Sequence, residues 1–129
     1  MPLVRIDLPD SISPDQALRI GEAINATMES VLLVPKGDKF QIIARHPRDS
    51  RNLTTAYLGI DYTEGLVVVQ VTLNQGRSVE LKKAFYAQVA ASLQNLGIRR
   101  QDVFISLIEV PRENWSFGNG EMQYAPTAL

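Results

Sequence analysis

The stretch that decides the fold is the first one in the chain, Met1-Pro2-Leu3-Val4-Arg5-Ile6-Asp7-Leu8. Its apolar residues Val4, Ile6 and Leu8 alternate with polar ones, the period-two pattern of a half-buried strand. Methionine followed by a small residue is a usual substrate for methionine removal, so we expect Pro2 to carry a free secondary amine on this strand. An α-amine titrates at roughly 7.7–8.0, so its surroundings decide whether it acts as a base or an acid. The alternative is that Pro2 only follows the start codon.

The composition is that of an ordinary globular chain and predicts one domain over residues 1–129. Hydrophobic residues make up 45%, mean hydropathy is -0.06, and the net charge of -1 offers no field for nucleic acid or an anionic membrane. There is no cysteine, and His46 is the single histidine. The sequence therefore gives no basis for thiolate chemistry or for a histidine-rich metal site. The first residues contain no long apolar h-region of the kind found in signal peptides, and no stretch approaches 18 apolar residues. We therefore expect a cytoplasmic protein with no metal or cofactor.

Two amphipathic helices are predicted after the first strand. Ser13 is a cap, Pro14 suits the first helical position, and the apolar spacing continues to about Leu33. The second helix begins after the cap Ser78 and stops at Gly97. The residues predicted to line its buried face are Leu81, Phe85, Val89, Leu93 and Leu96.

Three further strands are predicted, at residues 40–44, 66–73 and 102–110. The middle one is β-branched and nearly continuously apolar, so we expect it to be central and covered on both faces. Residues 46–65 are rich in polar and turn-forming types and predict an extended excursion with little regular structure. The segment 115–120 predicts a hairpin or ribbon.

The strand–helix–strand pattern occurs twice, as pseudo-repeats over about 2–44 and 66–110, with a C-terminal tail at 111–129. Two such units predict an α/β (α+β) fold, in which a four-stranded sheet carries both helices on one face. Since the other face would be left uncovered, we also expect the chain to oligomerise through it.

Several local sequences resemble the tautomerase superfamily, and within it the malonate semialdehyde decarboxylase branch of N-terminal proline enzymes. They are Pro2-Leu3, Val34-Pro35 with Asp38 and Phe40, Arg77-Ser78, Asn114-Trp115-Ser116-Phe117-Gly118, and Tyr124 to Leu129. The resemblance runs from end to end, and Trp-Ser-Phe-Gly is its most specific piece. It implies a homotrimer of the fold described above that acts on a small-molecule oxo acid without a cofactor.

The same resemblance implies the site residues. Pro2, Asp38 and Arg77 correspond to catalytic positions. Substrate-binding positions correspond to Gln75, Trp115, Phe117, Tyr124 and Leu129. Gln75 departs from the family, which has an arginine there, so one positive charge is missing. Arg5 would replace that charge only if its side chain reached the site.

The implied function is decarboxylation of an oxo acid, with hydratase or tautomerase activity beside it. A keto–enol tautomerase of the phenylpyruvate type is the alternative, and a non-catalytic trimeric scaffold or small-molecule binder is the alternative of another class. The nominated residues also have structural interpretations: a turn for Asp38, solvation for Arg77, packing for Trp115 and Phe117. Tyr124 could serve a neighbouring subunit.

Overall fold

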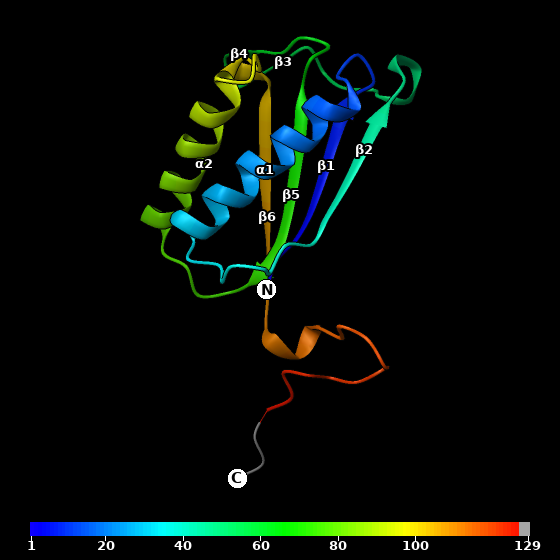
Figure 1. Cartoon of the computed structure of the whole chain (residues 1–129). Coiled ribbons are helices and arrows are strands. Elements are labelled where there is room, and N and C mark those ends of the chain that lie inside the picture. The colour runs from blue at the N-terminus through cyan, green and yellow to red at the C-terminus, as the bar shows by residue number, and fades with distance from the viewer. Residues whose placement is uncertain (127–129) are drawn as a thin grey trace.

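Strand β1 (Leu3–Pro9) lies inside a four-stranded sheet in the computed structural model, which describes residues 1–126 (Figure 1). The sheet order is β2-β1-β5-β6, with β2 at Gln41–His46, β5 at Val67–Asn74 and β6 at Val103–Val110. β1 pairs parallel with β2 and antiparallel with β5, and β5 pairs parallel with β6. The predicted α/β (α+β) class, with two β-α-β units in one sheet, is confirmed.

Helices α1 (Pro14–Ser30) and α2 (Val79–Gln94) cover the same face of this sheet (Figure 1). Both predicted caps form, since the hydroxyls of Ser13 and Ser78 each accept a hydrogen bond from a backbone N–H three residues on, at 3.1 and 3.2 Å. α1 ends before the predicted Leu33, which has a left-handed φ of 59°. No helix within residues 1–126 is long and apolar enough to cross a lipid bilayer.

The core fills the space between the sheet and the helices. The alternation predicted for the first strand is confirmed, because Val4, Ile6 and Leu8 are 3%, 0% and 0% exposed. The residues of α2 and β5 that join them in this core are Phe85, Val89, Leu93, Val67, Val69, Val71 and Leu73. Leu81 was expected there but is 37% exposed, since it lies in the first turn of α2, before the helix reaches the core.

The opposite face of the sheet is open within the described chain. Val68, Gln70 and Thr72 of β5 lie on it, and Gln70 is exposed while the other two are half-buried. Phe104 and Ile108 pair with Val68 and Thr72 and are each 43% exposed. The expectation that this strand is covered on both faces is therefore wrong for a single chain, because both helices pack on the other side.

Residues 47–66 form the predicted extended excursion. It contains the short helix η1 (Arg48–Ser50) and a small hairpin of β3 (Ala56–Tyr57) and β4 (Ile60–Asp61). The end of this excursion is held by Asp102, the last residue of the short helix η2 (Arg100–Asp102) that precedes β6. The buried carboxylate of Asp102 accepts a hydrogen bond from the backbone N–H of Thr63 at 2.8 Å.

The tail leaves β6 through the short helix η3 (Arg112–Asn114) and lies beyond the end of the sheet at which the N-terminus is found (Figure 1). The hairpin predicted at 115–120 is wrong, since no strand forms between residues 115 and 126. Gly118, Asn119 and Gly120 have successive positive φ values of 146°, 61° and 69°, which turn the chain too tightly for paired strands. The Gln123 side chain closes the loop instead.

Candidate active site

Four chain segments meet at one end of the sheet because of its mixed topology. β1 runs antiparallel to β5 and β6, so the start of β1 lies beside their ends, and the parallel strand β2 starts there too. Pro2 is buried at this start. The backbone N–H of Val4 donates to the Phe40 carbonyl at 2.9 Å, and Leu3 pairs with Thr72. The N-terminal end of β1 is thus held from both sides.

Three charged side chains act on the N-terminal amine of Met1. Burial lowers the pKa of this amine below its ordinary value of 8.0, and this is the largest effect. The Asp38 carboxylate raises the pKa, whereas the Arg77 and Arg112 guanidinium groups lower it. The nitrogen of Pro2 is one residue away from this amine. Asp38 and Arg77 were predicted from the sequence, whereas Arg112 was not.

Asp38 is delivered by the turn between α1 and β2. Gly37 has a φ of 89°, a conformation that residues with a Cβ rarely adopt, and it reverses the chain just before Asp38. The backbone N–H of Asp38 donates to the Pro35 carbonyl at 3.2 Å, and the residue is half-buried. Asp38 therefore lies in a turn, as its residue type favours. The same turn places its carboxylate close enough to the Met1 amine to raise the pKa of that amine.

Arg77 joins the two loops at this end of the sheet. Its Nη1 donates to the Asn74 carbonyl at 3.0 Å, and its Nη2 donates to the Leu32 carbonyl at 3.2 Å. Leu32 follows α1 and Asn74 ends β5, so the half-buried guanidinium connects the two β-α-β units. Arg77 is thus a fixed cation rather than a solvated one.

Gln75 is exposed, and its backbone N–H donates to the Val110 carbonyl at 3.0 Å. Its side chain is neutral, so it places no charge at the position where the resemblance found in the sequence implies an arginine. Arg5 does not supply that charge, because its Nη2 lies 3.3 Å from the Asp7 carboxylate and it is not among the groups that act on the amine.

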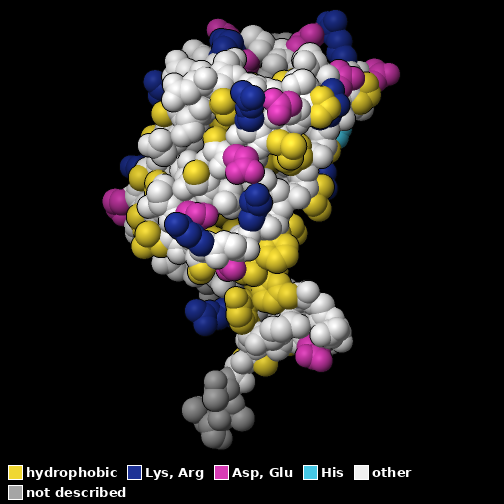
Figure 2. Space-filling model, in the orientation of Figure 1, with side chains coloured by type: hydrophobic (Ala, Val, Ile, Leu, Met, Phe, Trp, Pro, Cys, Tyr) yellow, Lys and Arg dark blue, Asp and Glu magenta, His cyan; other side chains and the backbone are white. Residues whose placement is uncertain are grey.

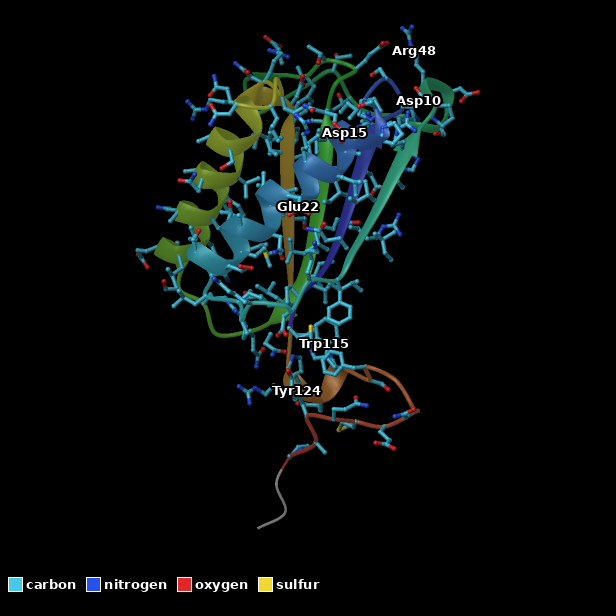
Figure 3. The ribbon with its side chains drawn as sticks, viewed as in Figure 1. Asp10, Asp15, Glu22, Arg48, Trp115 and Tyr124 are labelled. Carbon is cyan, nitrogen blue, oxygen red and sulfur yellow. The ribbon has the colours of Figure 1, made fainter. Side chains whose placement is uncertain are left out.

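An aromatic cluster of Trp115, Phe117 and Tyr124 closes the site from the tail side. The rings of Trp115 and Phe117 are stacked at 5.4 Å, and Tyr124 meets Phe117 edge-on at 5.1 Å. The indole N–H of Trp115 donates to Asn74 Oδ1 at 2.8 Å, which ties the cluster to the end of β5. Figure 3 shows Trp115 and Tyr124 at this end, and Figure 2 shows hydrophobic side chains gathered where the tail meets the body. Tyr124 thus packs within its own chain.

A cavity of about 510 Å³ opens beside this cluster. It is lined by Asn74, Gln75, Arg112, Glu113 and Tyr124, among others. The structure therefore brings Gln75 and Tyr124 together in a cavity, and it brings Asp38 and Arg77 to the amine. Leu129, predicted as a substrate-binding residue, lies outside the described residues.

Another cavity of about 510 Å³ lies at the opposite end of the sheet and contains none of the predicted site residues. His46 lines it and contacts the Asp7 carboxylate at 2.6 Å, so this histidine is remote from the N-terminal amine. Within residues 1–126, no group of three or more histidine and carboxylate side chains surrounds a possible metal position.

Residues 38–118 match a protein family described as tautomerase enzyme. The chain is 36% identical over 124 residues to the probable tautomerase YusQ of Bacillus subtilis strain 168, covering 95% of this chain and 98% of that protein. The structure of FG41 malonate semialdehyde decarboxylase inhibited by 3-bromopropiolate has a TM-score of 0.87 at 34% identity, covering 95% of this chain and 93% of that one. A fused 4-OT symmetric trimer, 20% identical, has the same fold with a TM-score of 0.76, covering 92% and 94%.

The chain therefore belongs to the tautomerase family and is an enzyme, and the resemblance found in the sequence is confirmed.

Proposed function

We propose that this tautomerase-family enzyme decarboxylates a small 3-oxo acid of the malonate semialdehyde type, with Pro2 as its catalytic amine. The observation that carries the proposal is the grouping of Asp38 and Arg77 around the buried N-terminal end of β1. The likeness to the malonate semialdehyde decarboxylase structure over nearly the whole chain supports it. Hydration or tautomerisation of related oxo acids accompanies the main reaction in this proposal.

In the proposed reaction the bond between C1 and C2 of 3-oxopropanoate breaks and C1 leaves as CO2. The electron pair of that bond moves into C2 and the C3 carbonyl, which becomes an enolate. Protonated Pro2 donates a hydrogen bond to the enolate oxygen and stabilises its charge. C2 then takes a proton from the Pro2 ammonium or from water, and acetaldehyde is released.

The other residues have roles that follow from their chemistry. Arg77 binds the substrate carboxylate and orients the breaking bond out of the carbonyl plane. Asp38 stabilises the cationic form of Pro2, in line with its effect on the neighbouring amine. Trp115 and Phe117, with Tyr124, form an apolar wall that excludes water and favours release of uncharged CO2. Gln75 contacts the substrate from the β5–α2 loop.

A keto–enol tautomerase of the phenylpyruvate type is the second candidate. It is favoured by the burial of the N-terminal end of β1, because burial disfavours the charged form of an amine, and a neutral amine acts as a base. In that reaction Pro2 takes the proton beside the carbonyl while Arg77 anchors the acid. The relative named probable tautomerase adds support.

We also propose that the enzyme works as a homotrimer assembled through the open face of the sheet. Phe104 and Ile108 of β6 are exposed on that face, beside Val68 and Thr72 of β5. Burying these apolar side chains against another subunit would favour association. A solved relative of the same fold forms a trimer. Light scattering coupled to gel filtration gives the mass directly, and a monomer at working concentrations would rule the trimer out.

The function is tested with protein expressed without an N-terminal tag, whose intact mass establishes that Met1 has been removed. CO2 release from 3-oxopropanoate and ketonisation of phenylenolpyruvate are then measured for the wild type and for Pro2→Ala. We expect the substitution to abolish activity without loss of the folded state, since alanine lacks the secondary amine and its ring. Unchanged turnover of every oxo acid tested would refute catalysis by Pro2.

The pH profile separates the two candidates. If protonated Pro2 is the catalyst, activity falls as pH rises through the pKa of the amine, and if neutral Pro2 is the catalyst, activity rises over the same interval. The ratio of decarboxylation to ketonisation at each pH identifies the main reaction.

A further inference from the structure

Arg112 lies near the N-terminal amine although no sequence pattern pointed to it. It is the first residue of η3, directly after Pro111, which follows the last residue of β6. Its charge acts on the Met1 amine in the same direction as that of Arg77. The geometry agrees, since Arg77 donates to the carbonyl of Asn74, and Asn74 lines the same cavity as Arg112. This places a second cation at the end of the sheet where Gln75 leaves the β5–α2 loop neutral.

The guanidinium of Arg112 is positioned by the aromatic cluster. Its central carbon lies 5.8 Å from the centroid of the Tyr124 ring, within the range of a cation–π contact. Tyr124 itself packs edge-on against Phe117, so the tail supplies both the arginine and the ring that holds it. Arg112 and Tyr124 line the same cavity as Gln75.

The N–H groups of Arg77 and Arg112 differ in how many already have a hydrogen-bond partner within the described residues. Nη1 and Nη2 of Arg77 donate to backbone carbonyls, which leaves Arg77 with fewer N–H groups for a ligand. Arg112 makes no ion pair with a carboxylate of residues 1–126, and its side chain is exposed to the cavity. Glu113 is the acidic residue of that cavity, but it is not among the charges that act on the amine.

We propose that Arg112 is a specificity-determining residue that binds the substrate carboxylate together with Arg77, with Tyr124 holding the plane of its guanidinium. This inference rests on the proposed function, since it assigns the group that recognises the acid end of the oxo acid. Two guanidinium groups can accept both carboxylate oxygens, which one partly committed arginine cannot do alone. The enzyme is therefore selective for free acids over uncharged analogues.

The test uses ligands that cannot react. Binding of 3-hydroxypropanoate and of 3-hydroxypropanamide is measured by NMR titration for the wild type, Arg112→Gln and Arg112→Lys. Arg48→Gln is the matched control, because it removes the same charge at the opposite end of the sheet (Figure 3). The Arg48 side chain is 84% exposed, so its loss does not disturb packing.

We expect Arg112→Gln to weaken binding of the acid by roughly tenfold, the value for one exposed charge-assisted contact, and to leave binding of the amide unchanged. Arg112→Lys should recover part of the loss, and Arg48→Gln should bind as the wild type does. Equal acid binding by Arg112→Gln and the wild type would overturn the proposal. So would an equal loss for acid and amide, which would mean that Arg112 supports only the shape of the cavity.

The N-terminal amine supplies a second readout. In protein that has lost Met1, the terminal amine is that of Pro2. Removing the positive charge of Arg112 should raise the pKa of this amine, because that charge lowers the pKa of the neighbouring Met1 amine. An amine pKa that does not rise in Arg112→Gln would contradict the placement of Arg112. Because the probes do not react, absence of decarboxylase activity would refute the proposed function and leave the assignment of Arg112 to be decided by binding.

Discussion

Replacing Arg77 with methionine tests whether one side chain both connects the loops of the site and binds the substrate. The substitution keeps much of the aliphatic length and removes the hydrogen bonds to the carbonyls of Asn74 and Leu32, which measure 3.0 and 3.2 Å. Hydrogen bonds to charged groups contribute about 1.5–3 kcal/mol each, and the lower part of this range applies because Arg77 is only half-buried. The two bonds together then stabilise the fold by about 3–4 kcal/mol.

Urea unfolding at equilibrium, followed by circular dichroism at one protein concentration, measures this loss for Arg77→Met and Arg77→Lys. The concentration is held constant because an oligomer would couple unfolding to dissociation. Lysine retains a charge but cannot donate to two carbonyls from a planar fork, so it should restore only part of the stability. An unfolding free energy of Arg77→Met within about 0.5 kcal/mol of the wild type, the range of ordinary surface substitutions, would refute the connecting role.

The proposed catalytic role of Arg77 is tested on protein shown to be folded under the assay conditions. Loss of a desolvated arginine–carboxylate contact should lower kcat/KM for the acid substrate by an amount equivalent to about 2–5 kcal/mol of activation free energy. Arg77→Lys should keep more of this activity than Arg77→Met, because the charge remains. If both variants process the acid as well as the wild type does, Arg77 is only a structural residue.

Two further substitutions probe neighbouring groups. Asp38→Asn removes a charge that raises the pKa of the Met1 amine. We expect the same effect on the Pro2 amine of the processed enzyme, so the limb of the pH–rate profile due to Pro2 should move to lower pH. A limb that stays in place would exclude Asp38 from the site. Trp115→Phe removes the indole N–H that donates to Asn74 Oδ1 at 2.8 Å and keeps an aromatic ring against Phe117. It should lower the unfolding free energy by about 1 kcal/mol in a urea titration, and no change would mean that this hydrogen bond does not hold the tail.

The secondary structure could be predicted because its signals are local. The alternation of Val4, Ile6 and Leu8 sets the face of β1, and Ser13 and Ser78 cap the helices through groups three residues away. The tail shows the limit of such signals. Aromatic and glycine residues at 115–120 are compatible with a hairpin, but consecutive left-handed backbone conformations, visible only in three dimensions, prevent strands from pairing there.

The open face of the sheet could not be assigned from the sequence of β5. An apolar run indicates that side chains avoid water, but not what covers them. Val68 and Thr72 face away from both helices, and within the described chain no helix covers them; their neighbours on this face are residues of the adjoining strands, such as Phe104 and Ile108 of β6. A partner surface is a property of the assembly and has no local pattern in a single strand.

The location of the site follows from strand direction, whereas its full set of charges does not. Because β1 is antiparallel to β5 and β6, any residue at its start must lie near residues that follow those two strands, and this brings Pro2 toward Arg77 and the tail. Arg112 occurs in a short polar turn, Pro111-Arg112-Glu113-Asn114, whose local pattern is that of a solvated loop. Its proximity to the amine depends on the path of the tail, which the indole hydrogen bond of Trp115 and the ring of Tyr124 determine. A charge missing at one position of the sequence can therefore be supplied by another segment that the topology brings to the same end of the sheet.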